Sequence, residues 1–127
     1  MTGQEILEFW LQAVNDGDVD ALVNLYADGA TLFPTFSPHA LADAQAIRSY
    51  FEALASRPAL AVSLYRSRLY QHELPGGLVV LAGVYAFKFE VDDDLLTFPS
   101  RFTIVLDPGA ERPIRHHHSA QVPRTLN

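Results

Sequence analysis

The pattern of apolar residues in this chain changes near residue 59, and this change restricts the folds that are possible. Before it, apolar side chains recur three and four positions apart, as on the buried face of amphipathic helices. From Ala59 onward, β-branched and aromatic residues form runs that are separated by turn sequences such as ELPGG, EVDDD and DPGAERP. Helices followed by strands are typical of the α+β class, in which the helices collect on one face of an antiparallel sheet. We therefore expect an α+β fold.

Three helices are expected in the N-terminal half. The first covers residues 3–15 and ends at the turn sequence NDGD. Asp18 occupies the N-cap position of a short second helix, whose apolar face runs from Val19 to Tyr26. The third begins at about Asp43 and ends before Pro58, because a proline disfavours the helical conformation of the residue that precedes it.

Four strands are expected in the C-terminal half, joined by short turns into an antiparallel meander. Their ranges are about 60–72, 78–90, 95–106 and 113–121. A short β-prone segment from Ala30 to Phe33 lies in a loop whose prolines argue against a longer element. The strand sequence GLVVLAGVYAFKF is apolar at odd and at even positions, so both faces of the sheet need cover. The helices cover one face, and we expect a second copy of the chain to cover the other in a two-fold homodimer.

Length and composition exclude several classes of protein. A chain of 127 residues fits one domain, which we expect to span residues 1–127. The absence of cysteine excludes disulfides and thiolate ligands, and a net charge of -6 disfavours nucleic acid as a partner. The first residues carry acids and no basic region ahead of a continuous apolar run, and no apolar stretch reaches membrane-spanning length. We expect a cytoplasmic protein without a membrane partner and without a cofactor.

Five fragments occur in an order and spacing that point to a known family. They are the stretch from Trp10 to Thr35, then AIRSYF, GVYAF, SRFTIV and finally IRHHHSAQVP. Together they resemble the bacterial SnoaL-like proteins of the nuclear transport factor 2-like superfamily, which are related to the association domain of calcium/calmodulin-dependent kinase II. The resemblance covers nearly the whole chain. Where relatives commonly continue HHHSS, this chain has Ala120 in place of the second serine.

The resemblance implies a cystatin-like cone, in which a curved antiparallel sheet wraps around three N-terminal helices and encloses a pocket. It does not imply one reaction, because this fold is shared by isomerases, dehydratases, hydrolases, transport factors and oligomerisation domains. It also implies that Arg101 points into the pocket, as the arginine of the corresponding strand does in the kinase association domain.

Arg101 and the three consecutive histidines are the candidate binding residues. Arg101 lies inside a strand, where a charged side chain needs an anion, an internal acid or access to solvent. His116 and His118 leave their strand on the face opposite to His117. We expect these two to face the cavity with Arg101 and His117 to turn toward the dimer contact. Alternatively, the histidines pack in a polar cavity or at a subunit contact.

The remaining candidates are aromatic. Trp10, Tyr26 and Tyr85 could line the cavity as ligand contacts, although core packing is the commoner role for such residues. Two histidines without a third ligand nearby do not predict a metal site, so none is expected. The strand interiors contain no acid that could act as a buried base, which leaves a histidine or Asp28 in the expected turn after Tyr26.

Three functions fit these features. The first is a homo-oligomeric domain whose conical pocket binds a small organic molecule, preferably an anion. The second is an isomerase, cyclase or dehydratase that acts on a polyketide-like or steroid-like substrate with histidine as general base. The third is an oligomerisation module. On the first of these, the guanidinium of Arg101 would hold a ligand carboxylate through paired hydrogen bonds.

Overall fold

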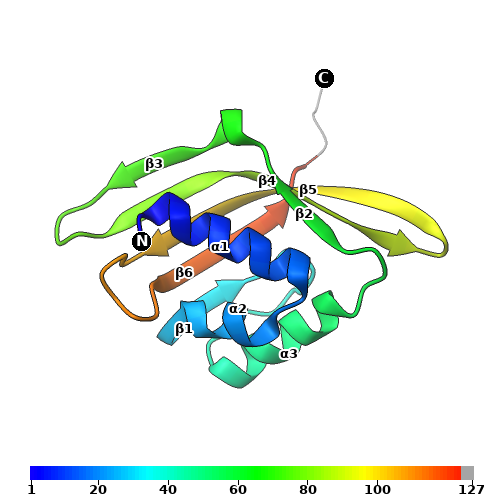
Figure 1. Cartoon of the computed structure of the whole chain (residues 1–127), viewed down its shortest axis with the longest axis horizontal. Helices are drawn as coiled ribbons and strands as arrows, with labels where there is room; N and C mark the ends of the chain where they lie inside the picture. The colour runs from blue at the N-terminus through cyan, green and yellow to red at the C-terminus, as the bar shows by residue number, and fades with distance from the viewer. Residues whose placement is uncertain (124–127) are drawn as a thin grey trace.

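The computed structural model describes residues 1–123 and contains helices on one side of a curved sheet (Figure 1). Each α-helix begins at a capping side chain: Thr2 forms a capping box with Glu5, and Asp18 and Asp43 accept backbone N–H groups of the next two helices. These caps explain why the helices begin where the sequence indicated. The helices are α1 (Gly3–Asp16), α2 (Val19–Leu25) and α3 (Ala44–Ala55).

The sheet has six strands in the described part of the chain and does not close into a barrel. Its order is β1-β6-β5-β4-β2, and β3 also pairs with β4. The strands are β1 (Tyr26–Phe33), β2 (Ala61–Leu64), β3 (Tyr70–Glu73), β4 (Val79–Val91), β5 (Asp94–Leu106) and β6 (Ile114–Gln121). The long β4–β5 hairpin extends past the helices at one end of the molecule (Figure 1). The α+β prediction is confirmed.

The prediction of a wholly antiparallel sheet is wrong at β1. This strand is longer than the segment expected from Ala30 to Phe33, and it pairs in parallel with β6, placing Thr31 opposite His116 and Phe33 opposite His118. Asp28 therefore lies within a strand and not in a turn. A parallel pairing between the first and last strands joins residues far apart in the sequence, so no local pattern reveals it.

The strand expected at 60–72 is divided into two. A short 3-10 helix, Arg66–Arg68, separates β2 from β3, and the two strands pair with different ends of β4. Gly83 lies where this crossing segment approaches β4. A Cβ atom at that position would lie 2.9 Å from the carbonyl oxygen of Arg68, so glycine permits the close approach.

The two faces of the sheet differ in composition. The inner face, toward the helices, carries large apolar residues such as Leu81, Phe102 and Ile104, which are at most 2% exposed. The outer face is uncovered in the single chain. Residues that lie opposite one another across β1, β6, β5, β4 and β3 form a row on that face: Phe33, His118, Thr103, Ala82 and Tyr70. Within residues 1–123, no helix has the length and apolar character needed to cross a membrane.

Candidate functional site

The interior of the cone contains one connected group of polar side chains around His117. The Tyr26 hydroxyl lies 2.9 Å from His117 Nδ1, and the Tyr85 hydroxyl lies 3.0 Å from His117 Nε2. Trp10 Nε1 donates to the Tyr26 hydroxyl over 3.1 Å. All four side chains are at most 3% exposed. The imidazole of His117 thus links β1, β4 and α1 through hydrogen bonds inside the core.

The expected orientation of the three histidines is therefore reversed. His116 and His118 do share a face with Arg101, but this is the outer face, and His117 is the one that enters the cone. The physical reason is the partner strand: His117 lies opposite Ile104, on the face of β5 that carries the large apolar side chains. The alternation of the histidine side chains between the two faces of β6 was predicted correctly. The face assigned to His117 and the face assigned to His116 and His118 were each wrong.

An indole N–H can only donate, so the Tyr26 oxygen accepts from Trp10. A neutral imidazole donates through one ring nitrogen and accepts through the other, so His117 donates to one of the two tyrosine hydroxyls and accepts from the other. Every buried side-chain nitrogen and oxygen in the described chain has a partner. Burial raises the pKa of Tyr26 and of Tyr85, so both hydroxyls keep their hydrogens.

A buried neutral His117 makes the stability of the protein depend on pH. Desolvation, with a smaller effect of His116 and His118, lowers the pKa of His117 from 6.5 to about 3. Between these values the unfolded chain binds a proton that the folded chain does not. We therefore expect the free energy of unfolding to fall as the pH decreases from 6.5, with a contribution of up to about 1.4 kcal/mol per pH unit.

Urea unfolding at a series of pH values measures this dependence. A His117→Gln variant cannot titrate at this position, so its unfolding free energy should change less between pH 6.5 and pH 4 than that of the wild type. Equal slopes for the two proteins would show that the imidazole is not held neutral in the folded state.

The three aromatic candidates fill the interior. The ring of Trp10 stacks on Tyr85 at a centroid distance of 5.3 Å, and Tyr85 stacks on Phe102 at 4.5 Å. The polar atoms of Trp10, Tyr26 and Tyr85 take part in the hydrogen bonds around His117 described above. Besides these aromatic residues, the buried polar side chains among residues 1–123 are Ser100, His117 and Ser119. No carboxylate of the described chain is therefore buried in the cone to act as a base.

Arg101 and His118 line a groove on the outer face of the sheet. Its volume is about 670 Å³, within the range of about 300–1,000 Å³ that is usual for small-molecule sites. The short 3-10 helix and β3 contribute Arg68 and Tyr70 to one side of it. The other lining residues are mostly small: Ala82, Gly83, Val84, Phe102, Thr103 and Ala120. We call this the outer groove.

The outer groove is positively charged although the chain is acidic. None of the described residues that line it is a carboxylate. The ion pairs within residues 1–123 lie elsewhere and join Arg48 to Asp20, Arg66 to Glu8, and Arg115 to Asp107. Arg101 and Arg68 therefore line one hollow and have no carboxylate partner among residues 1–123, and the guanidinium of Arg68 lies 5.8 Å from the centre of the Tyr65 ring. Such a local field attracts anions.

Sequence reasoning missed Arg68 and Tyr70, because it placed both inside one continuous strand at about 60–72. The short 3-10 helix between β2 and β3 interrupts this strand, and both residues line the outer groove. His116 lies on the same face, but its Nδ1 atom is 2.6 Å from the Thr31 hydroxyl. Among residues 1–123 no group of three or more His, Asp or Glu side chains could hold a metal ion.

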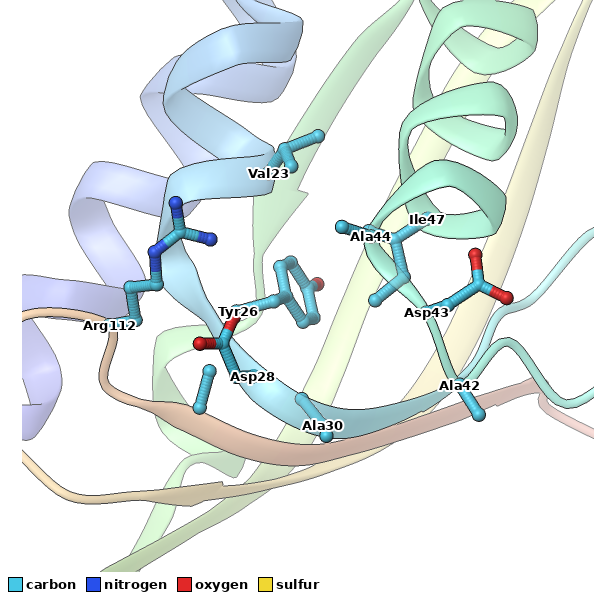
Figure 2. A pocket seen from close by; sticks show the side chains of 11 residues that line it. Val23, Tyr26, Asp28, Ala30, Ala42, Asp43, Ala44, Ile47 and Arg112 are labelled. Atoms are coloured by element: carbon cyan, nitrogen blue, oxygen red, sulfur yellow. The ribbon is translucent and has the colours of Figure 1, made fainter.

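A smaller pocket of about 200 Å³ lies between α2, β1 and the start of α3. Figure 2 shows Arg112 and Asp28 on one side of it and Asp43 on the other, with the ring of Tyr26 between them. Asp43 caps α3 through a 2.8 Å bond from the N–H of Ala46, and Arg112 donates to Asn24. Asp28 is exposed here and lies outside the cone, so it does not supply the buried base considered above.

Comparisons with known proteins agree with this fold. A solved structure described as a putative calcium/calmodulin-dependent protein kinase II association domain from Xanthomonas campestris is 24% identical, with a TM-score of 0.84 over 96% of this chain and 86% of that chain. A protein with a cystatin-like fold from Caulobacter vibrioides is 10% identical, with a TM-score of 0.77 over 94% of this chain and 87% of that one.

A third similar structure is SalBIII, described as an epoxide hydrolase/cyclase-like enzyme of pyran ring formation in salinomycin. It is 19% identical, with a TM-score of 0.71 over 94% of this chain and 89% of that chain. No functionally curated protein matches the chain. At these identities the likeness establishes the fold alone.

The family itself is established by a match to nearly the whole described length. The family model of the SnoaL-like domain matches residues 4–123, which include all six strands and the three α-helices except Gly3. The chain therefore belongs to the SnoaL-like domain family.

Proposed function

We propose that this protein binds a small organic anion, with a carboxylate as the group recognised, in the outer groove. The observation that carries the proposal is that two arginines, Arg68 and Arg101, line one hollow that has no carboxylate among its described lining residues. Arg101 holds the ligand carboxylate through paired hydrogen bonds, since the planar guanidinium matches the two carboxylate oxygens. His118 adds a third polar contact from the neighbouring strand.

The site that we propose differs from the one expected from the sequence, which was inside the cone. Stacked rings of Trp10, Tyr85 and Phe102 occupy the interior, and their polar partners are satisfied. An enzyme that uses a histidine base inside the cone is less well supported, because His117 is buried there with its pKa lowered to about 3. Among the three consecutive histidines, His118 is exposed on the outer face and lines the outer groove.

Calorimetric titration tests this proposal with a panel of small carboxylates, such as acetate, benzoate and succinate, and with the matching amides. We expect at least one carboxylate to bind and its amide to bind at least tenfold more weakly, because an amide loses the charge-assisted hydrogen bonds. Equal affinity for acids and amides, or no binding of any acid, would contradict an anion site.

We further propose that two copies pair through the part of the outer face beside the outer groove, which leaves the groove open. Phe33 is 41% exposed there, next to the half-buried Val80 and Val105, and none of these three residues lines the groove. Exposed apolar side chains that gather on one face favour association. The similar structure from Xanthomonas campestris is described as a putative association domain, which supports association in general.

Light scattering at micromolar concentration should report a dimer for the wild type. A Val105→Glu variant places a charge in the centre of the proposed contact and should shift the protein to the monomer, because an unpaired charge is costly to bury. Ala53→Glu, at an exposed position of α3, is the matched control and should remain dimeric. A monomeric wild type with a folded spectrum would refute the dimer.

A further inference from the structure

The pocket between α2, β1 and α3 carries charges of both signs, and the proposed anion site does not use it. Its charged lining residues are Asp28, Asp43 and Arg112. Asp28 belongs to β1 and Arg112 to the loop before β6, and the two lie on the same side of the pocket (Figure 2). Neither takes part in an ion pair within residues 1–123, and Arg112 donates to Asn24 over 3.3 Å. We call this the charged pocket.

An irregularity of β1 gives Asp28 its place in the charged pocket. Between Tyr26 and Thr31, β1 contains more residues than the segment of β6 with which it pairs. The extra residues form a bulge, in which Gly29 has a φ of 78° that residues with a side chain rarely adopt. Bulges are frequent beside binding sites because they turn a side chain away from its regular direction. The bulge thus allows Asp28 to line a pocket beside the sheet.

The charged pocket also has apolar walls and a small volume. Val23 and Ile47 are 6% and 2% exposed, and the ring of Tyr26 lies between the charged groups (Figure 2). The Tyr26 hydroxyl is bonded to Trp10 and His117 in the core, so Tyr26 contributes its ring. The volume of about 200 Å³ is below the range of about 300–1,000 Å³ that drug-sized ligands need. A matching ligand therefore has few atoms and a short apolar part.

We propose that the charged pocket binds a small zwitterion, an amino acid with a short apolar side chain. The ligand carboxylate accepts hydrogen bonds from the guanidinium of Arg112, and the ligand ammonium donates to the carboxylate of Asp28. An amino acid carries both charged groups on one carbon atom, which suits protein groups of opposite charge on the same side of the pocket. Asp43 adds a second carboxylate, which disfavours a ligand that is only an anion. This site and the proposed anion site are separate, and either could exist without the other.

Three ligands with the same apolar part test the need for both charges. L-Valine carries both, 3-methylbutanoate lacks the ammonium, and isobutylamine lacks the carboxylate. Each is titrated into the ¹⁵N-labelled protein while the amide signals are followed by NMR. We expect L-valine to shift the signals of Asp28, Gly29 and Ala44 and to bind about tenfold to a hundredfold more tightly than either analogue, the effect of one charged hydrogen-bonding group. An analogue that binds as tightly as L-valine, or no shift at these residues, would overturn the proposal.

Variants remove the charges one at a time. Asp28→Ala and Arg112→Ala should each weaken the binding of L-valine by about tenfold or more. Both side chains are exposed and outside the ion pairs, so the fold should be kept. Glu111→Ala and Arg115→Ala are the matched controls, because they remove the same charges at nearby positions that do not line the pocket. They should change the affinity by less than about threefold, since solvent and salt screen exposed charges. Equal losses in variant and control would refute the site.

One further comparison separates this site from the outer groove. Arg101→Ala should bind L-valine as tightly as the wild type does, because Arg101 lines the outer groove and not the charged pocket. Arg112→Ala should likewise keep any affinity for the carboxylates of the calorimetric panel. If Arg101→Ala loses the affinity for L-valine and Arg112→Ala keeps it, the amino acid binds in the outer groove and the charged pocket is not its site.

Discussion

Replacing His117 with alanine should reduce the free energy of unfolding by roughly 2–6 kcal/mol, because two buried hydroxyls lose a partner at about 1–3 kcal/mol each. These are the hydroxyls of Tyr26 and Tyr85, both inside the core. The loss is a large part of the stability of a typical domain, which is about 5–15 kcal/mol. Urea unfolding followed by circular dichroism measures it.

His118→Ala is the matched control, one residue further along the same strand. His118 is exposed on the outer face, so its removal should change the unfolding free energy by no more than about 0.5 kcal/mol. Similar losses for the two variants, or a larger loss for His118→Ala, would contradict the orientation of β6 described above.

Replacing Arg101 with alanine should weaken the binding of a carboxylate by about tenfold to a hundredfold, because hydrogen bonds to charged groups contribute about 1.5–3 kcal/mol. The fold should be unaffected, since Arg101 is exposed and makes no ion pair within residues 1–123. Isothermal calorimetry with the tightest-binding acid of the panel measures the change. Arg101→Lys keeps the charge without the paired geometry and should give an intermediate affinity.

Arg48→Ala controls for the general loss of a positive charge. Arg48 pairs with Asp20 on the helical side of the molecule, away from the outer groove. Its removal should leave carboxylate affinity within about twofold, since distant surface charges are largely screened at physiological salt. If Arg48→Ala and Arg101→Ala weaken binding equally, the effect comes from net charge and not from a site.

Local patterns in the sequence were enough to predict the helices and the long strands. The caps at Thr2, Asp18 and Asp43 and the turn glycine Gly17 fix the helix ends within a few residues. The parallel pairing of β1 with β6 was not predictable in this way, because it depends on residues such as Thr31 and His116 that are far apart in the chain.

The faces of the strands at the site were the hardest feature to predict. The period of two separates His117 from His116 and His118, but it does not say which set faces the helices. The sequence of the neighbouring strand β5 indicates which face is buried. Phe102, Ile104 and Leu106 are its large apolar residues and share one face, and Arg101 lies on the opposite face. If the face of β5 with the larger apolar side chains had been taken as the buried face, Arg101 would have been predicted on the outer face and His117 in the interior. The implied position of Arg101 in the family pocket led to the opposite assignment.

The proposed anion site is the outer groove and not the interior of the cone. A crystal of the protein soaked with 4-bromobenzoate tests this directly, since anomalous scattering locates the bromine. We predict a peak within the outer groove, with the carboxylate against Arg101 and close to Arg68 and His118. A peak inside the cone beside Trp10, or in the pocket of Asp28 and Arg112, with none in the outer groove, would contradict it.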